Sequence, residues 1–455
     1  MLRVDEILKA VQGKLVCGSR NKTVRGYSID SRAIKKGEAF IAIKGDKFDG
    51  HDFIPQALKK GASCVIACAI QKPSAAGRAT FIEVNDTQKA LAGIARALRV
   101  KYDIPVIAIT GSAGKTTVKE MLAWVLSAKL NVLSNEGTKN NHIGMPITLC
   151  GLNKSHNIAV LELGTNHFGE IKNLSQICLP DAAVVTNIGP AHLEHFNNLE
   201  GVLKEKYTLV ENLRGAQLAV LNADDAMLSP KLLNHCAAKP FILGFGINNS
   251  ADFLASDIRL TPGGIKFLIN GRHKFSLNTC GRHNVYNALA AVAAARAFGI
   301  EYKTIIRRLA SFTFPAGRLS LKSCNKVKFI DDTYNSNPLS LKQALDALEK
   351  LEGAGRKIFV MGDMLELGEA KEAFHCEAGF NAAKICDIFI AVGSLSRLAA
   401  KEAASCGLKA KSIFTCDSAL EARDILVNKI SLKDGDIVLV KGSRGMKMEN
   451  VLNAI

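Results

Sequence analysis

Residues 104–122 read IPVIAITGSAGKTTVKEML, and this stretch decides how the middle of the chain folds. The apolar run at 106–109 is partly β-branched and predicts a buried strand, and a helical pattern begins at Lys115. The turn between strand and helix consists of small residues, namely Gly111, Ser112, Ala113 and Gly114. Backbone N–H groups of such a loop, and the dipole of the helix that follows it, attract anions. The stretch therefore predicts a phosphate-binding loop.

The three residues after the turn carry the chemistry of a nucleotide site. Lys115 has the reach to contact β- and γ-phosphates, and the Thr116 hydroxyl suits a Mg²⁺ ion, with Thr117 beside it. The full pattern G-x-x-x-x-G-K-[ST] is not met, because Ile109 stands at its first glycine position. A plain glycine turn at the end of a buried strand would explain neither the lysine nor the two threonines. We therefore expect ATP and Mg²⁺ to bind here.

The composition is that of a multidomain globular protein with excess positive charge. A chain of 455 residues is too long for a single core, so several domains are expected. A formal net charge of +17 suggests a nucleic acid, a membrane surface or an acidic small molecule as partner. The lysines form no long run, and one Trp and six Tyr leave few rings for base stacking. We expect a phosphorylated small-molecule substrate and no nucleic acid.

The cysteines and the N-terminus indicate a cytoplasmic protein. None of the twelve cysteines forms a C-x-x-C motif, and most lie in apolar runs such as ASCVIACAI at 62–70. The N-terminal MLRVDEILKAVQGKL is an amphipathic, partly acidic helix pattern rather than a signal peptide. No window of about 20 apolar residues suggests a membrane span. We expect a monomer in a reducing cytoplasm.

The order of the predicted elements gives an α/β fold of three domains. Residues 1–102 form a small mixed α/β N-terminal domain. Residues 103–312 alternate strands and helices, which predicts a central P-loop ATPase-like domain with a mainly parallel sheet. Period-2 alternation and two glycine turns add antiparallel hairpins at 251–280. Residues 313–455 restart the alternation and predict a C-terminal Rossmann-like domain, although no G-x-G-x-x-G follows its first strand.

Polar side chains end two further strands of the predicted central sheet. Glu162 ends the strand in NIAVLEL, and His192 follows the strand in AAVVTNIGPA. The carboxyl ends of parallel strands meet at one sheet edge, so Glu162 and His192 should lie near the phosphate loop. The alternative for each is an ordinary surface or helix-capping role. Together with Thr116 they suit Mg²⁺ held on ATP phosphates. Lys204 and Lys206 lie on the next helix. The alternative to a functional role is that both belong to an ordinary charged face exposed to solvent.

Amide and charged residues recur later in the chain. Asn284 and Asn287 open an Ala-rich helix; their amides suit an adenine edge, and an N-cap role for Asn284 is the alternative. Arg318, at a predicted domain joint, has the reach to contact a phosphate. The segment IDDTYNSNP at 330–338 either contacts ribose or a polar substrate, or caps a helix that begins at Pro338.

These motifs, in this order, resemble the Mur ligase superfamily over nearly the whole chain. The segments that carry the resemblance are TGSAGKTTVKEM, NNHIGMPITL, ELGTNHFGEI, NIGPAHLEHF, GRHNVYNALAA, PAGRL, IDDTYNSNP, GDMLELGE with HCEAG, and LVKGSRGMKME. SIDSRAIKKGEAFIAIKGDKFDGH, DDTYNSNP, GDMLELG and KGSRG are similar to the member that adds D-alanyl-D-alanine. The acidic-proline-arginine motif of the sibling that adds the third amino acid is absent.

The resemblance implies a role for particular residues of this sequence. Lys115, Glu162, His192 and Lys206 would be catalytic. ATP would contact the loop from Gly111 to Thr117 and also Asn284, Asn287, Arg318 and Asp332, the last at the ribose. Substrate contacts would come from Ser31 and Arg32 at the UDP end, from Asn140 and Asn141 along the acceptor channel, and from Asn335 and Asn337 at the dipeptide.

The resemblance also implies a metal site and a modified lysine. Thr116 and Glu162 would ligate one Mg²⁺, and His192 and Lys206 would bear on a second. Lys206 would be carbamylated, which requires a neutral amine and hence a lowered lysine pKa. Here Tyr207 and Thr208 follow it where many relatives have Gly-Glu, which leaves Lys204 as the alternative.

The implied reaction is ATP-dependent amide formation between UDP-N-acetylmuramoyl-tripeptide and D-alanyl-D-alanine. The γ-phosphoryl group would convert the tripeptide carboxylate into an acyl phosphate, which the dipeptide amine would attack. Domain joints near 101–104 and 311–318 would let the domains close over it. Two alternatives stay open: a folate-polyglutamating ligase of the same superfamily, which normally lacks a domain like 1–102, and a nucleic-acid-stimulated NTPase.

Overall fold

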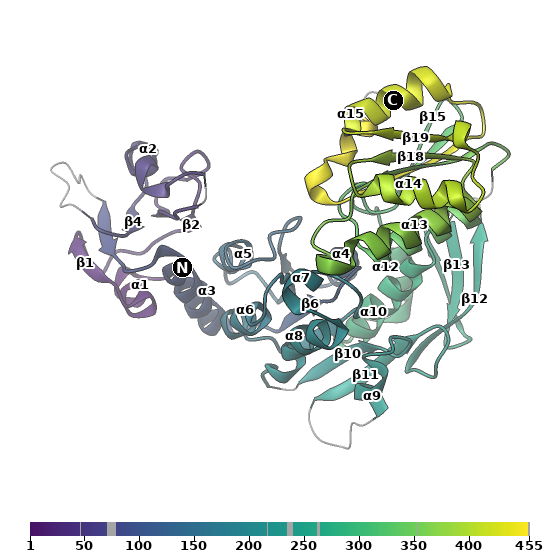
Figure 1. Ribbon diagram of the computed structural model, residues 1–455. Helices are drawn as coiled ribbons and strands as arrows, with labels where there is room; N and C mark the ends of the chain where they lie inside the picture. The colour runs from purple at the N-terminus through teal and green to yellow at the C-terminus, as the bar shows by residue number, and fades with distance from the viewer. Residues whose placement is uncertain are drawn as a thin grey trace.

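Three β-sheets succeed one another along the chain and define its architecture (Figure 1). The computed structural model describes residues 1–45, 47–70, 79–215, 217–233, 240–261, 264–351 and 353–453. This arrangement confirms the expected three-domain α/β fold. None of the helices in these ranges is long and apolar enough to cross a bilayer.

The N-terminal sheet has the strand order β1-β5-β4-β3-β2, in which β2 to β5 pair in parallel and β1 pairs antiparallel with β5. The segment YSIDSR contributes only the two residues of β2 to it. The elements are α1 (Val4–Val11), β1 (Lys14–Cys17), β2 (Tyr27–Ser28), β3 (Ala39–Ile41), α2 (Ile54–Lys59), β4 (Cys64–Ala67), β5 (Thr80–Glu83) and α3 (Thr87–Tyr102).

The central sheet has nine strands in the order β14-β13-β12-β11-β10-β9-β6-β8-β7. It is parallel from β7 to β12, and the β12–β13–β14 meander is antiparallel, as the 251–280 pattern predicted. Its strands are β6 (Val106–Thr110), β7 (Val132–Ser134), β8 (Ile158–Glu162), β9 (Ala182–Val185), β10 (Leu218–Asn222), β11 (Phe241–Gly246), β12 (Phe253–Thr261), β13 (Gly264–Ile269) and β14 (His273–Leu277). Its helices are α4 (Lys115–Leu126), α5 (Gly144–Leu149), α6 (Glu170–Cys178), α7 (Leu193–Phe196), α8 (Leu199–Glu211), α9 (Ser229–Leu233), α10 (His283–Ala297) and α11 (Tyr302–Ala310).

Alternate side chains of β6 pack into two separate hydrophobic cores, one on each face of this sheet. Ile107 and Ile109 pack with α4 and α10 on one face. Val106 and Ala108 pack with α5, α6 and α8 on the other, and this second core continues into α3 and the N-terminal sheet. The period-2 alternation of a strand buried on both faces explains this division. The N-terminal and central domains therefore share one hydrophobic core.

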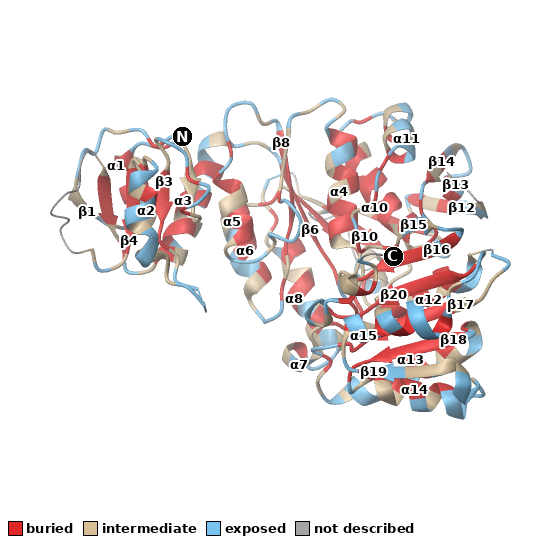
Figure 2. Cartoon of the chain, turned by 90° about the horizontal axis from the view of Figure 1, so that it is seen from above, coloured by how far each residue is buried: buried red, intermediate tan, exposed pale blue. Residues whose placement is uncertain are grey.

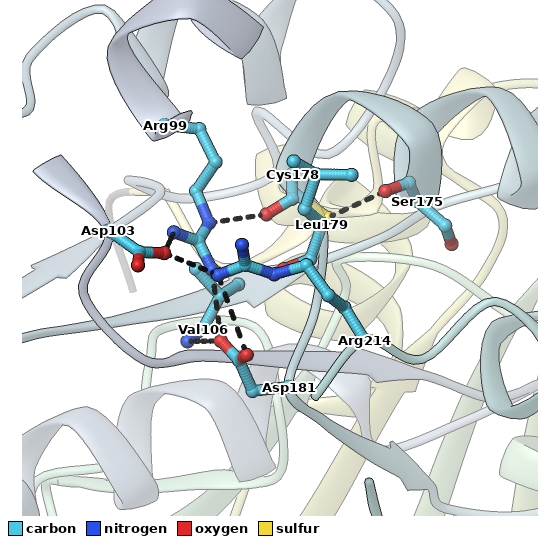
Figure 3. Close-up of polar contacts among 8 residues, drawn as sticks. All are labelled: Arg99, Asp103, Val106, Ser175, Cys178, Leu179, Asp181 and Arg214. Carbon is cyan, nitrogen blue, oxygen red and sulfur yellow. Dashed lines mark hydrogen bonds and ion pairs between the residues drawn. The ribbon is translucent and has the colours of Figure 1, made fainter. Parts of the chain in front are cut away.

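A buried arginine fastens the joint between these two domains (Figure 3). Arg99, in the last turn of α3, is fully buried, and its Nε donates to the carbonyl of Cys178 at 2.8 Å. One guanidinium nitrogen also donates to the carbonyl of Leu179 at 3.1 Å and to Asp181 Oδ2 at 3.0 Å. Asp181 in turn accepts from the backbone N–H of Val106, the first residue of β6. The first joint is thus held by charge-assisted hydrogen bonds.

The C-terminal sheet has the order β15-β16-β20-β17-β18-β19 and is parallel except for β15. The sequence pattern did not reveal β15, a mostly polar edge strand. The elements are β15 (Ser320–Cys324), β16 (Val327–Asp332), α12 (Pro338–Lys350), β17 (Lys357–Gly362), the 3₁₀ turn η2 (Gly368–Ala370), α13 (Lys371–Ile385), β18 (Ile388–Val392), α14 (Ser396–Ser405), β19 (Ile413–Cys416), α15 (Ala419–Asp424) with a π-helical continuation, and β20 (Ile437–Lys441). Figure 2 shows the strands of this sheet buried beneath its helices.

Candidate active site

A cavity of about 730 Å³ lies where the central and C-terminal domains meet. The carboxyl ends of β6 and β8 open into it from the central sheet, and those of β16 and β20 from the C-terminal sheet. This is the position at which open α/β sheets bind ligands. The cavity brings together most of the residues that the sequence singled out: Ser112, Ala113, Gly114, Lys115, Thr116, Thr117, Asn140, Asn141, Glu162, His192, Asn284, Asn287, Arg318, Asp332, Asn335 and Asn337.

In the predicted phosphate loop, Gly111 and Gly114 adopt positive φ angles, which glycine favours. Gly114 is the N-cap of α4 with φ +83°, and a Cβ there would lie 2.3 Å from Asn287 Oδ1, so only glycine fits. Lys115 Nζ donates to the carbonyl of Gly111 at 2.7 Å. Burial is the main cause that lowers the pKa of Lys115, while the nearby Glu162 carboxylate opposes this shift. The lysine therefore sits over the loop in a desolvated environment, where its charge interacts strongly with an anion.

Glu162 is fixed at the end of β8 by three hydrogen bonds from neighbouring residues. Its Oε2 accepts from the Thr116 hydroxyl at 2.7 Å, and its Oε1 accepts from Asn140 Nδ2 at 2.7 Å. Asn135, which the sequence analysis missed, accepts from the Glu162 backbone N–H and donates to its carbonyl. Asn135 follows β7, the neighbour of β8 in the sheet. Its place beside Glu162 could be predicted only from the order of the strands.

His192 stands at the head of α7 with φ +53° and reaches the cavity from the β9 side. Its Nδ1 lies 2.5 Å from Oε2 of Glu366, which belongs to the C-terminal domain. Glu366 lies within the motif GDMLELGE, and its local sequence predicts no role for it.

Lys206 and Lys204 differ sharply in their surroundings. Lys206 is buried in α8, whereas Lys204 is exposed. No hydrogen bond or ion pair to Lys206 Nζ occurs among the described residues. Burial lowers its pKa well below the ordinary lysine value, and the charge of Lys115 lowers it further. Of the two lysines, Lys206 is therefore the one whose surroundings favour the uncharged amine.

Two asparagines lie in the first turns of α10, both buried. The helix begins at His283 with Arg282 as N-cap, so the N-cap alternative for Asn284 is wrong. Instead Asn284 Nδ2 donates to the Thr279 hydroxyl, and Asn287 Nδ2 donates to Asn284 Oδ1 at 2.9 Å. A second cavity of about 190 Å³ adjoins them and is lined by groups that suit a planar ring, among them Asn187, Asp225, Phe245, His283 and Tyr286.

The C-terminal domain places a cation on the phosphate loop. Arg318 donates to the Thr116 hydroxyl at 2.9 Å, and its guanidinium stacks over the Tyr334 ring with 4.2 Å to the centroid. Asp332 accepts from the backbone N–H of Leu319 at 3.2 Å and from Lys441 Nζ at 2.5 Å. Lys441 ends β20 beside β16, and the sequence analysis had assigned it no role.

Asn335 and Asn337 both line the cavity, and each also makes a hydrogen bond within the C-terminal domain. Asn337 caps α12 by accepting from the backbone N–H of Ser340, and Pro338 is the first helical residue, as the capping alternative predicted. Its Nδ2 lies 3.4 Å from the carbonyl of Ser112 in the phosphate loop. Asn335 is exposed, and its Oδ1 accepts from the backbone N–H of Arg444.

The remaining predicted substrate residues have local partners. Asn141 lines the cavity, and its Oδ1 accepts from the N–H of Gly144, the first residue of α5. Ser31 and Arg32 lie in the N-terminal domain and do not line this cavity. The Ser31 hydroxyl donates to Gln56 Oε1, and Arg32 is exposed and paired with Asp30 at 2.9 Å.

Three family models match successive parts of the chain. Residues 23–99 match the Mur ligase family catalytic domain, residues 109–295 the Mur ligase middle domain, and residues 317–444 the Mur ligase glutamate ligase domain. The chain belongs to the Mur ligase family.

Several full-length relatives within the family share one name. A UDP-N-acetylmuramoyl-tripeptide–D-alanyl-D-alanine ligase of Bacillus subtilis is 35% identical over 455 residues, covering 99% of this chain and 97% of the relative. The crystal structure of MurF from Acinetobacter baumannii matches with a TM-score of 0.87 at 32% identity, covering 99% and 97% of the two chains. The MurF ligase of Thermotoga maritima in complex with ADP matches with a TM-score of 0.81 at 29% identity, covering 94% and 96%.

Proposed function

We propose that this protein uses ATP to join D-alanyl-D-alanine to UDP-N-acetylmuramoyl-tripeptide through an acyl-phosphate intermediate. The observation that carries the proposal is the Thr116 hydroxyl, on which Glu162 of the central domain and Arg318 of the C-terminal domain converge. The full-length relatives that share this name support the choice of substrates. Free thiols at the eleven described cysteines support a cytoplasmic location.

ATP binding follows from the groups that line the two adjoining cavities. The phosphates lie on the N–H groups of the loop from Gly111 to Thr117, and Lys115 and Arg318 leave their present acceptors to neutralise the β- and γ-phosphates. The adenine enters the smaller cavity beside Asn287 and Tyr286. Asp332, at the end of β16, is placed to bind the ribose.

The residues present also fit Mg²⁺. No group of three or more His, Cys, Asp or Glu side chains in the described ranges is arranged to hold a metal ion. Mg²⁺ in nucleotide sites needs only one or two protein ligands, because substrate phosphates and water supply the rest. Thr116 and Glu162 are such a pair, already 2.7 Å apart, and His192 lines the same cavity. When bound, the ion neutralises the charge that develops on the transferred phosphoryl group.

The chemistry is a phosphoryl transfer followed by an acyl transfer. An oxygen of the tripeptide carboxylate attacks the γ-phosphorus and ADP leaves, which turns a poor leaving group into phosphate. The dipeptide amine then attacks the acyl carbon, phosphate departs, and the amine loses a proton. Lys115 and Arg318 stabilise the negative charge at each stage. Because water would hydrolyse the acyl phosphate, the cleft between the central and C-terminal domains must close around it.

Lys206 supports a further element of the proposal, its carbamylation. The lone pair of a neutral lysine amine forms an N–C bond to CO₂, and the nitrogen releases a proton to solvent, which leaves a negatively charged carbamate. The Nζ of the buried Lys206 makes no hydrogen bond or ion pair with any described residue and has a lowered pKa, and a negative group there would be attracted by the Lys115 charge. The modification would thus replace repulsion between two lysines by attraction.

The function is tested by measuring phosphate release with each substrate set. We expect turnover only with UDP-N-acetylmuramoyl-tripeptide and D-alanyl-D-alanine together, and a product whose mass equals their sum less one water. Tripeptides ending in diaminopimelate and in lysine are assayed side by side. Turnover stimulated by DNA or RNA and indifferent to the dipeptide would refute the proposal, as would turnover with folate and glutamate in its place.

A further inference from the structure

A loop of the C-terminal domain reaches across to the central domain at a point outside the substrate contacts described above. This loop, residues 363–368, follows β17 and leads into η2. It contains Glu366, whose carboxylate meets His192 at the head of α7. The two residues lie 174 positions apart in sequence, so only the packing of the two domains brings them together.

The 363–368 loop is anchored within its own domain. The backbone N–H of Met364 donates to His375 Nε2 at 3.0 Å, and that of Leu365 donates to the Ser443 hydroxyl at 2.9 Å. The N–H of Ser443 donates back to the carbonyl of Asp363 at 3.1 Å. These bonds tie the loop to the carboxyl end of β20 and to α13. Glu366 is therefore presented from a fixed base.

The same loop packs directly on the backbone of α7. Gly368 has φ +60°, and a Cβ there would lie 3.3 Å from Glu194 Cα and 3.4 Å from its nitrogen. A backbone neighbour of this kind cannot move aside as a side chain does, so glycine permits the approach. The Glu366–His192 contact thus lies beside a point where the two domains pack backbone against backbone, and the Glu366 side chain itself is half exposed.

The His192 ring contacts two side chains, and its Nε2 makes no hydrogen bond with any described residue. Its Nδ1 lies 2.5 Å from Glu366 Oε2, and its ring meets Phe196 edge-on, with 6.4 Å between centroids and an interplanar angle of 88°. An ionised carboxylate can only accept a hydrogen bond, so this contact assigns the shared hydrogen atom to Nδ1. A neutral imidazole protonated at Nδ1 carries its lone pair on Nε2.

We propose that Glu366 is a positioning residue that fixes the His192 ring with Nδ1 protonated and Nε2 free to act on the phosphate side of the cavity. The role given to Nε2 rests on the proposed function, in which ATP and Mg²⁺ occupy the cavity. A carboxylate behind a ligating histidine orients the ring and raises its basicity. Because Glu366 comes from the C-terminal domain, the histidine is set only when that domain lies against α7. Domain closure and the readiness of the metal side of the site are thereby coupled.

The chain offers a matched control for this residue. Glu369 lies three positions further on in η2, is exposed, and makes no hydrogen bond or ion pair with any described residue. Glu366→Ala removes the carboxylate from His192, and Glu369→Ala removes an equal charge from the same turn. Glu366→Gln retains the side-chain length and an oxygen that accepts from Nδ1, so it should rescue most of the effect.

The primary test reads the His192 ring in the full-length protein without nucleotide or metal. Long-range ¹H–¹⁵N correlation spectra of histidine-labelled protein, with the His192 signal assigned through His192→Gln, report which nitrogen carries the proton. We expect an Nδ1-protonated ring in the wild type and in Glu369→Ala, and a loss of that preference in Glu366→Ala. An identical His192 signal in Glu366→Ala and wild type would overturn the proposal.

The second test measures ligase kinetics against Mg²⁺ concentration. Loss of such a partner typically costs about 10- to 100-fold in metal affinity or activity, so the KM for Mg²⁺ should rise by that order in Glu366→Ala. The KM for D-alanyl-D-alanine should stay unchanged, and Glu366→Gln should recover most of the loss. Equal Mg²⁺ dependence in Glu366→Ala and Glu369→Ala would contradict the proposal. Because the ring spectra need no catalysis, an inactive wild type with the expected spectra would refute the proposed function alone.

Discussion

Replacing Gly114 by alanine should damage ATP binding more than backbone strain alone explains. An alanine at φ +83° costs about 1–2 kcal/mol, because a left-handed backbone crowds Cβ. The new Cβ would also lie 2.3 Å from Asn287 Oδ1, so Asn287 must retreat by roughly 1 Å to reach ordinary contact. That retreat breaks its buried hydrogen bond to Asn284, now 2.9 Å long, at a cost of about 1–3 kcal/mol.

Gly169 provides the matched control for this change. It is the N-cap of α6 with φ +88°, nearly the conformation of Gly114, but a Cβ there would meet nothing within 4 Å. Gly169→Ala therefore carries the strain without the clash. Titration calorimetry with a non-hydrolysable ATP analogue and Mg²⁺ should give a higher Kd for Gly114→Ala than for Gly169→Ala, because ATP requires Asn287 in its present position. The ratio reaches at most roughly 150-fold, which is the upper cost of the broken hydrogen bond expressed as a ratio. Equal affinities in the two variants would refute the role given to Asn287.

Three further predictions each concern one side chain. Lys206→Ala should lose most ligase activity and regain part of it when a short carboxylate is added to the assay; full activity without rescue would exclude the carbamate. Burial lowers the pKa of His283 to about 4, so the unfolded chain takes up a proton between pH 6.5 and 4 that the folded protein refuses, and stability falls over that range. Denaturant titrations should show His283→Gln abolishing that loss, at most about 3 kcal/mol, and an unchanged pH profile would contradict the assignment. Arg99→Met should destabilise the protein by about 2–6 kcal/mol in the same titrations, because the carbonyls of Cys178 and Leu179 lose their donor at about 1–3 kcal/mol each, while Asp181 keeps the Val106 N–H and the nearby Arg214. A loss below about 1 kcal/mol would show that the first joint is held by apolar packing instead.

The parts of the site that could be predicted from sequence share one physical reason. Lys115, Thr116, Glu162 and His192 all follow apolar strands, and parallel strands present their carboxyl ends at one edge. Strand periodicity and glycine spacing are local signals, so the loop and its neighbours could be placed before any contact was known. The three-domain α/β fold followed from the same alternation of strand and helix.

The parts that could not be predicted depend on contacts between distant segments. Glu366 and Lys441 acquire their partners only through domain packing and strand order, which a single sequence does not encode locally. Asn284 failed as an N-cap because the helix starts one residue earlier, at His283. The edge strand β15 is mostly polar and lacks the alternation that marks a half-buried strand.

The central claim is that ATP spans the cleft between the central and C-terminal domains, with its terminal phosphate beside Thr116 and Glu162. The most direct measurement is a crystal structure with a non-hydrolysable ATP analogue and Mn²⁺, which anomalous scattering locates. The account predicts a Mn²⁺ peak in contact with the Thr116 hydroxyl and Glu162, the triphosphate on the loop from Gly111 to Thr117, and Arg318 turned onto the γ-phosphate. A nucleotide bound elsewhere, or a Mn²⁺ peak remote from Glu162, would contradict it.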